Sequence, residues 1–127
     1  MDKKIVETSE APKAIGPYSQ AIVSGGFLFS AGQIPLDPVT MQLVERDIRV
    51  QTERVLENLK AVLKAENLDF SKVVKTTIYL KDLNDFQAVN EIYSKYFGDF
   101  KPARSTVQVA KLPLDSLIEI ELIAGAV

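Results

Sequence analysis

Cysteine and histidine, two residue types that carry much of enzyme chemistry, are absent from this chain of 127 residues. Without cysteine the protein has no disulfide, no thiolate nucleophile and no zinc–thiolate site. Without histidine it lacks the usual general base and the commonest metal ligand. Any catalysis must therefore use arginine, lysine, carboxylates, hydroxyls, backbone N–H groups or water.

Long hydrophobic runs and a large excess of one charge are lacking as well. The longest apolar runs span only a few residues, which excludes a membrane span, and residues 1–4 lead into no apolar core of a secretory signal. We therefore expect a cytoplasmic protein. The net charge is −2, with lysines interspersed among acids, so the sequence carries no electrostatic footprint for nucleic acid. The length predicts a single domain over residues 1–127.

Hydrophobic periodicity predicts a sheet of about six strands with two helices. The Gly-Gly pair at 25–26 is typical of a tight hairpin turn, because glycine tolerates positive φ. The longer helix is expected to begin at Asp47, with Gln51 on its polar side, and the shorter one with Asn84 and Gln87 as a capping pair. In chain order we expect a strand over 4–8, strands over 21–24 and 27–30, a helix over 47–63, a strand over 73–80, a helix over 84–97, and strands over 102–109 and 118–122.

The last two expected strands place charge in the sheet. Alternation puts Arg104 and Thr106 on one face of the first strand, and Glu119 and Glu121 side by side on one face of the second. If the two strands are neighbours, a guanidinium faces carboxylates in a partly buried sheet. Such a group is either a structural ion pair or a binding site for an anion, and the residues alone leave both open.

One face of the predicted sheet lacks a cover. Two helices cover the other face, yet the strand residues opposite them include Val73, Tyr79, Leu117 and Ile123, which are too apolar to leave in water. The simplest cover is another copy of the chain in a closed symmetric assembly. Grooves between copies would then be natural ligand sites.

Four further residues are candidates with equally simple structural interpretations. Gly32 could let backbone N–H groups approach a ligand, or could only turn the chain. Tyr18 and Ser30 could supply hydroxyls to a site, and Asn90 could reach it from the shorter helix, but each also fits a local structural role.

Six short segments of the chain form a recognisable set: IGPYSQ at 15–20, AGQIP at 31–35, VKTT at 74–77, Phe86 with VN at 89–90, PARSTVQVAKLP at 102–113 and IEIEL at 118–122. The arginine-containing segment, followed at this spacing by Ile-Glu-Ile, is the most specific part. Taken together, these segments resemble the Rid family, also called the YjgF family, and within it the reactive intermediate deaminase A type. The resemblance covers nearly the whole chain.

The resemblance implies a fold, an assembly and a reaction. The fold is an α+β, chorismate-mutase-like arrangement of a mixed sheet with two helices on one face, and the assembly is a homotrimer with clefts between subunits. The reaction is the hydrolysis of enamines and imines, such as 2-aminoacrylate or 2-iminobutanoate, to a 2-keto acid and ammonia. Pyridoxal-phosphate-dependent dehydratases of amino-acid metabolism release such compounds. Neither a cofactor nor a metal is implied.

The resemblance also assigns roles to residues. Arg104 would hold the substrate carboxylate, and Glu119 would orient and activate the attacking water. The backbone at Gly32 and Thr106 would contact the ligand. Two positions depart from the common pattern, since Thr106 replaces a frequent cysteine and Ala31 a frequent serine. The residues expected to bind substrate are Tyr18, Ala31, Gly32, Asn90 and Thr106.

Two other functions stay open at this point. A non-catalytic module of amino-acid or purine metabolism could use the same arginine to bind a small carboxylate. Some members of the family are described as endoribonucleases or translation inhibitors. The acidic net charge and the absence of histidine disfavour that role, because RNA cleavage needs charge complementarity and usually an acid–base pair.

Overall fold

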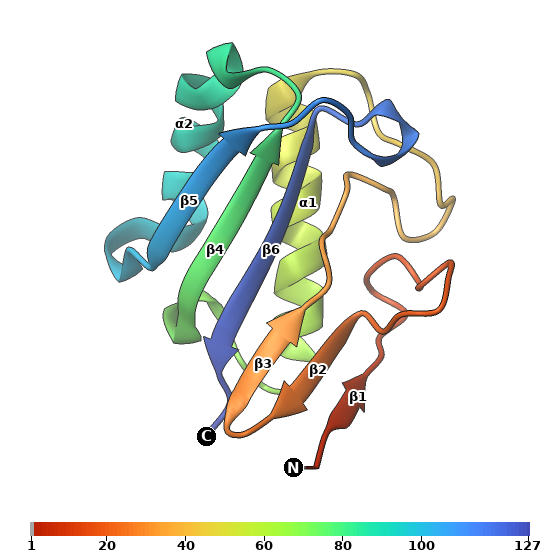
Figure 1. Ribbon diagram of the computed structural model, residues 1–127, viewed down its shortest axis with the longest axis vertical. Helices are drawn as coiled ribbons and strands as arrows, with labels where there is room; N and C mark the ends of the chain where they lie inside the picture. Colours follow the sequence, from red (N-terminus) through yellow and green to blue (C-terminus); the bar gives the residue numbers. More distant parts are fainter. Residues whose placement is uncertain (1) are drawn as a thin grey trace.

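The computed structural model describes residues 2–127, which form one six-stranded mixed sheet with two α-helices. The strands lie in the order β1-β2-β3-β6-β4-β5, and β4 and β5 form the parallel pair. Both helices lie behind one face of the sheet in Figure 1, which confirms the expected fold. The elements are β1 (Lys4–Val6), β2 (Ala21–Ser24), β3 (Phe27–Ser30), α1 (Ile48–Lys64), β4 (Val73–Leu80), α2 (Phe86–Phe97), β5 (Ala103–Gln108) and β6 (Ile118–Gly125).

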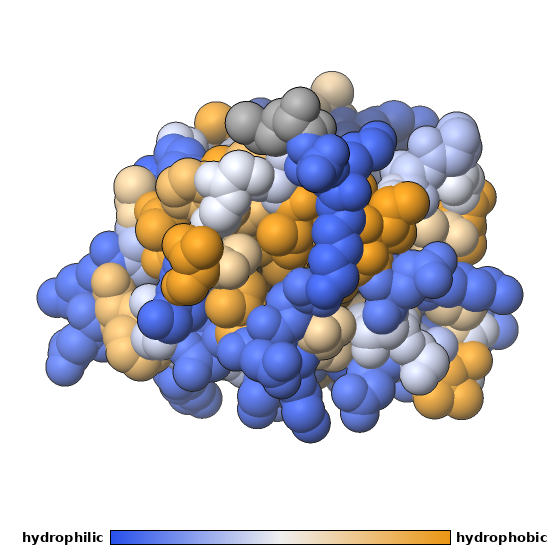
Figure 2. Space-filling view, turned by 90° about the horizontal axis from the view of Figure 1, so that it is seen from below, coloured by the Kyte–Doolittle hydropathy of each residue, from blue (hydrophilic) through white to orange (hydrophobic). Residues whose placement is uncertain are grey.

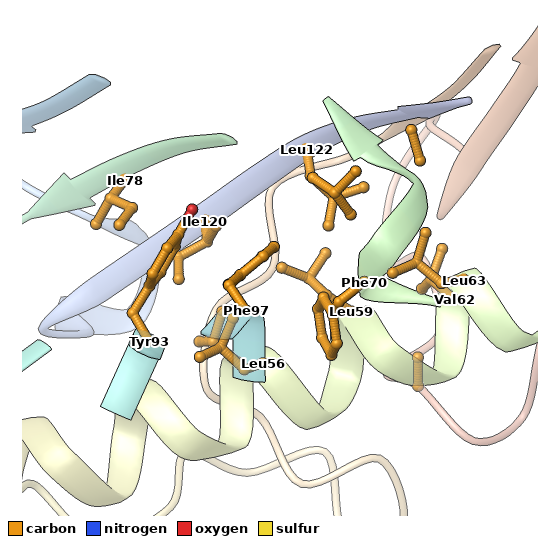
Figure 3. Packing of buried hydrophobic residues seen from close by; sticks show 14 of the residues in the cluster. Leu56, Leu59, Val62, Leu63, Phe70, Ile78, Tyr93, Phe97, Ile120 and Leu122 are labelled. Carbon is orange, nitrogen blue, oxygen red and sulfur yellow. The ribbon is translucent and has the colours of Figure 1, made fainter. Parts of the chain in front are cut away.

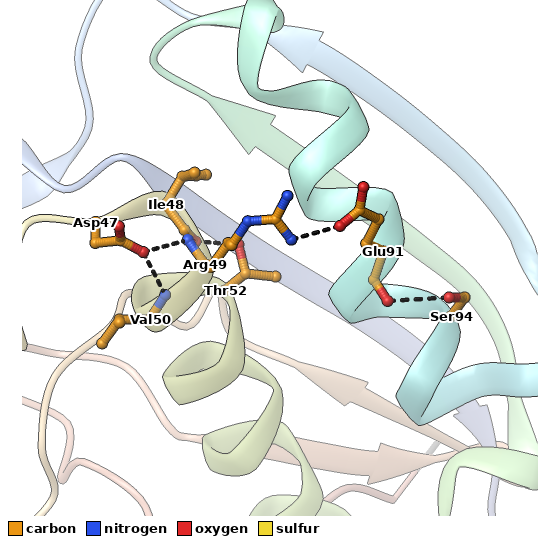
Figure 4. A network of polar contacts seen from close by, with 7 residues as sticks. All are labelled: Asp47, Ile48, Arg49, Val50, Thr52, Glu91 and Ser94. Atoms are coloured by element: carbon orange, nitrogen blue, oxygen red, sulfur yellow. Dashed lines mark hydrogen bonds and ion pairs between the residues drawn. The ribbon is translucent and has the colours of Figure 1, made fainter.

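The N-terminal end of α1 is fixed as the sequence predicts. The Asp47 carboxylate accepts the backbone N–H groups of Arg49 at 2.9 Å and Val50 at 3.0 Å, two of the donors that a helix start leaves without partners. Arg49 also pairs with Glu91 of α2 at 2.5 Å, which links the two helices at their exposed surface (Figure 4). Neither helix, within the described part of the chain, has the length and hydrophobicity that a membrane crossing requires.

The predicted start of α2 is wrong. A short 3-10 turn, Leu83–Asp85, precedes the helix, and Asp82 caps that turn by accepting the N–H of Asn84 at 2.9 Å. Asn84 therefore lies inside the turn and forms no capping pair with Gln87. The helix ends at Gly98, as expected, where φ is 51°.

The core lies between the sheet and the helices (Figure 3). Aromatic rings of α2 fill its centre, since Tyr93 and Phe97 stack at 4.2 Å and Phe97 meets Phe70 edge-on at 4.8 Å. Each fully buried large side chain contributes about 1.5–3 kcal/mol of stability. Sheet residues that face these rings are Ile78, Ile120 and Leu122, and those from α1 are Leu56, Leu59, Val62 and Leu63.

The open face of the sheet is apolar in part, but Val73 does not belong to it. A β-bulge between Val73 and Lys75 turns Val73 into the core, where it is 5% exposed, and leaves Val74 outside. Large side chains still exposed on this face include Ile5, Phe27 and Phe29. Figure 2 shows hydrophobic patches between hydrophilic side chains at the end of the molecule that carries both termini.

Candidate functional site

Arg104 and Glu119 lie on opposite faces of the sheet. Strand β4 separates β5 from β6, so the two strands are not neighbours. Arg104 is aligned with Thr76, which is fully buried under the helices, whereas Glu119 is aligned with Tyr79 on the open face. An ion pair of Arg104 with Glu119 or Glu121 inside one chain, which the sequence left open, is therefore wrong.

The guanidinium of Arg104 rests on two aromatic rings of α2. Its central carbon lies 4.9 Å from the ring centre of Tyr93 and 5.3 Å from that of Phe86. Such cation–π contacts orient the group while leaving its N–H donors available. The Tyr93 hydroxyl shares a 2.8 Å hydrogen bond with Thr76, and burial raises the pKa of Tyr93. Among residues 2–127, Arg104 forms no ion pair.

A hollow of about 500 Å³ opens beside this guanidinium, and we call it the arginine hollow. Asn90 of α2 contributes to its wall, beside Arg104. Thr106 follows Arg104 on the same face of β5, and its hydroxyl is buried with no hydrogen-bond partner in the described chain. The residues that line the hollow are Asn90, Tyr93, Ser94, Phe97, Gly98, Lys101, Pro102 and Arg104.

A second hollow, of about 430 Å³, contains Glu119 and is called the glutamate hollow below. Tyr18, Ala31 and Gly32 line it, so three of the predicted substrate-binding residues gather there. The two hollows share no lining residue. The remaining lining residues are Pro12, Lys13, Ile15, Gln33, Ile34, Leu36 and Pro113.

The Glu119 carboxyl group is held in a place that only glycine leaves free. A Cβ atom on Gly32 would lie 1.9 Å from Oε2 of Glu119 and 2.8 Å from its carboxyl carbon. Burial, and to a lesser extent the charge of Glu121, raise the pKa of Glu119. Tyr79 lies beside both acids, and its pKa is raised by burial and by their charges. The result is a half-buried carboxylate that is a stronger base than an ordinary glutamate.

Backbone bonds of Gln33 and side-chain bonds of the buried Asn58 support the walls of the glutamate hollow. Gln33 exchanges two backbone hydrogen bonds with Ile120, at 2.8 and 3.1 Å, directly beside Glu119. Asn58 of α1 donates to the carbonyls of Leu36 at 3.0 Å and Ile34 at 3.4 Å.

Gln51 is not on the solvent side of α1, as the sequence analysis predicted. It is 1% exposed and accepts the N–H of Leu117 at 2.9 Å. Gln51 and Asn58 both belong to the row of buried residues that includes Val55 and Val62. Their i+4 and i+3 spacing to these valines is the signal that could have identified them.

Two hydroxyl candidates differ in their surroundings. Ser30 accepts the N–H of Leu122 at 2.9 Å, which is a structural role between β3 and β6. Tyr18 is 52% exposed at the rim of the glutamate hollow, and within the described chain its hydroxyl accepts only a long bond from Ile15 at 3.5 Å. Tyr18 is therefore free to turn toward a ligand. Within residues 2–127, no cluster of acidic side chains suitable for a metal ion is present.

Alanine at position 32 is expected to displace the Glu119 carboxyl group. The clash should lower the free energy of unfolding by about 1–3 kcal/mol and return the pKa of Glu119 toward the ordinary glutamate value. Denaturant unfolding and an NMR titration of the carboxyl carbon measure the two effects. Gly16→Ala is the matched control, because its Cβ would meet Tyr18 at an ordinary 3.5 Å. An unchanged Glu119 titration in Gly32→Ala would contradict the close fit.

Comparison with known proteins identifies relatives over the whole length. The family model described as endoribonuclease L-PSP matches residues 8–126. A RutC family protein of Pyrococcus abyssi is 57% identical over 124 residues, which cover 98% of both proteins. A chloroplastic protein of Arabidopsis thaliana, named Reactive Intermediate Deaminase A, is 54% identical over 122 residues, which cover 96% of this chain and 65% of that protein.

The solved structures include close neighbours of the fold. The protein YyfA of Yersinia pestis, described as a member of the conserved Rid protein family with unknown function, superposes with a TM-score of 0.95 at 52% identity. The match covers 98% of this chain and 99% of that one. At this identity the likeness extends beyond the fold to the sequence that builds it.

Proposed function

The chain belongs to the Rid family, also called the YjgF family, and from this premise we propose that it hydrolyses reactive 2-imino acids and their enamines to 2-keto acids and ammonia. The observation that supports this best is the combination of Arg104, which has no acidic partner among residues 2–127, with Glu119, a half-buried carboxylate of raised pKa. A guanidinium fork suits a substrate carboxylate. A carboxylate of raised pKa suits a general base for water.

A site that uses both groups needs two copies of the chain. Arg104 and Glu119 lie on opposite faces of one sheet and in separate hollows, so a small molecule in one chain reaches only one of them. We propose a homotrimer in which the arginine hollow of one subunit meets the glutamate hollow of the next. Three equivalent clefts then form in a closed ring. The partly apolar open face of the sheet supports such an assembly, because a second copy would cover it.

The proposed reaction needs no redox step and no covalent intermediate with the protein. Arg104 binds the carboxylate, and Asn90 and the backbone at Thr106 position the rest of the molecule. An enamine first takes up a proton at carbon, and an imine takes one up at nitrogen, so that both give the protonated imine. Glu119 removes a proton from water as the oxygen bonds to the carbon of the protonated imine, and the C=N electron pair moves to nitrogen to give a neutral amino group. The product of this step is a carbinolamine.

Ammonia leaves in the second half of the reaction. Glu119 returns its proton to the nitrogen, the C–N bond breaks, and the hydroxyl group loses its proton to water as the C=O bond forms. The sum is imine plus water giving 2-keto acid plus ammonia. Positioning supplies much of the rate, because an imine is already electrophilic and the barrier is partly entropic.

The lining of the glutamate hollow supports a short aliphatic substrate. Ile15, Ile34 and Leu36 offer apolar surface, and Ala31 is small where a serine is common in the family. We propose 2-iminobutanoate and 2-aminoacrylate, which dehydratases release from threonine and serine, as substrates. The name of the Arabidopsis relative supports this reaction class.

The endoribonuclease activity in the description of the family model has less support in this chain than imine hydrolysis. The net charge is −2, and the glutamate hollow contains Glu119, so a phosphate group would meet a carboxylate there. A non-catalytic module that binds a small carboxylate needs the arginine hollow alone. The assay below separates it from the deaminase.

Threonine and threonine dehydratase generate 2-iminobutanoate, and semicarbazide traps it. Wild-type protein is expected to lower the amount of trapped imine, while Arg104→Ala should reduce kcat/KM about 100-fold or more, because the substrate carboxylate loses its charge-assisted bonds. Arg49→Ala is the control, since Arg49 is a surface arginine paired with Glu91. Equal trapping with and without wild-type protein would contradict the deaminase and favour the binding module.

A further inference from the structure

The turn Pro113–Asp115, between β5 and β6, forms one wall of the glutamate hollow through Pro113. Leu114 and Asp115 both have positive φ, 55° and 58°, a conformation that residues with a Cβ rarely adopt. The Leu114 side chain is 60% exposed. Burial of its own side chains therefore does not hold this turn in place.

Charged groups from two other parts of the chain hold the turn instead. Lys81, which directly follows β4, donates to the Asp115 carboxylate. Arg46, shortly before α1, lies 3.4 Å from the other carboxylate oxygen and donates to the Asp115 carbonyl at 2.7 Å. Arg46, Lys81 and Asp115 are called the clamp below.

The clamp differs from the support of two other lining residues, Ile34 and Leu36. Ile34 and Leu36 are held by the buried Asn58, whereas the clamp side chains are between 37% and 58% exposed. Exposed ion pairs contribute little and are screened by salt. Directly after the turn, Ser116 is fully buried and Leu117 bonds to Gln51, so any displacement ends there. Pro113 can therefore shift more easily than Ile34 or Leu36.

We propose that Asp115 is a positioning residue for the glutamate hollow. Through Arg46 and Lys81 it holds the adjustable wall, Pro113, in place, and it thereby limits the length of the aliphatic side chain that the site accepts. This inference rests on the proposed function, since it assumes that a 2-imino acid or its 2-keto acid product occupies the hollow. Release of the clamp lets the wall move outward, which admits a longer side chain without altering Arg104 or Glu119.

Binding of 2-keto acids tests the clamp without requiring turnover. Calorimetric titration of the full-length protein with 2-oxobutanoate and with the longer 4-methyl-2-oxopentanoate gives an affinity ratio. Asp115→Asn is expected to shift this ratio about 3- to 5-fold toward the longer acid, the largest effect that an exposed ion pair supports. Asp115→Glu should keep the wild-type ratio. Lys4→Gln, which removes the exposed pair of Lys4 with Glu66 at 2.9 Å, should also leave it unchanged.

Hydrogen exchange gives a second readout. The N–H of Ser116 bonds to the carbonyl of Pro113 at 3.1 Å, and its exchange should be faster in Asp115→Asn, while that of Ile120 stays as in the wild type. The proposal would be overturned if Asp115→Asn kept the wild-type affinity ratio or if Lys4→Gln shifted that ratio equally. It would also be overturned if hydrogen exchange at Ser116 were unchanged in Asp115→Asn, or if the wild type bound neither acid. Wild-type protein that binds both acids yet hydrolyses no imine would contradict the deaminase alone, and the affinity ratio would still decide the clamp.

Discussion

Glutamine in place of Glu119 is expected to lower kcat for imine hydrolysis by about 100- to 10,000-fold, while KM changes by less than about 3-fold. The amide has nearly the shape of the carboxylate, so it keeps the fit against Gly32, but it cannot take a proton from water. In the wild type, kcat should fall as the pH drops through the raised pKa of Glu119, because the base becomes protonated. Steady-state rates of the trapping assay, measured as the pH is lowered, should show this acid limb in the wild type and not in Glu119→Gln.

Glu121→Gln is the matched control for this experiment. Glu121 adds to the raised pKa of Glu119 without lining the glutamate hollow, so its removal should move the acid limb to lower pH and leave the maximal rate within about 10-fold of the wild type. A Glu119→Gln variant with the full wild-type kcat would exclude Glu119 as the base. An acid limb that stays at the same pH in Glu121→Gln would contradict the electrostatic coupling of the two acids.

A mixture of two inactive variants is expected to recover activity, which is the second large effect. Arg104→Ala keeps a functional glutamate hollow, and Glu119→Ala keeps a functional arginine hollow. Unfolding and refolding the two together at equal amounts should return about one quarter of wild-type activity, since about three quarters of random trimers are mixed and each mixed ring has one complete cleft. The trapping assay on the refolded mixture, against wild type treated identically, measures this recovery.

The controls for the mixture are each variant refolded alone and the two variants mixed without unfolding. All three should remain inactive if subunits exchange slowly. A double variant, Arg104→Ala with Glu119→Ala, mixed with wild type should only lower activity. Failure of the mixture to recover activity, with the size of the assembly unchanged, would show that one subunit supplies both groups or that the two groups do not act together.

The elements that depend on local patterns were predictable from the sequence. The hairpin over β2 and β3 follows from two glycines that both have positive φ in the structure. The start of α1 at Asp47 follows from its capping side chain. Burial of Ile118 and Ile120 follows from strict alternation in β6. The bulge at Val73 could not be read from the sequence, because it depends on how β4 pairs with β6.

The sequence named the residues of the candidate site but not how the fold arranges them. The resemblance of short segments named Arg104 and Glu119, and the strand periods placed both on a sheet. The order of strands is not a local property, so the sequence could not show that β4 lies between them. The same holds for Gln51, which the sequence analysis placed on the polar side of α1, because its partner Leu117 lies far away in the sequence.

The central position of β6 has a consequence for how the chain acquires its structure. This strand is hydrogen-bonded to β3 on one side and to β4 on the other, yet it is the last of the six to be synthesised. While the ribosome is still translating residues before Ile118, the hairpin half and the β4–β5 half have no strand to join them. Nascent chains should therefore stay open, with unpaired strand edges in need of chaperone protection, until the final strand leaves the exit tunnel.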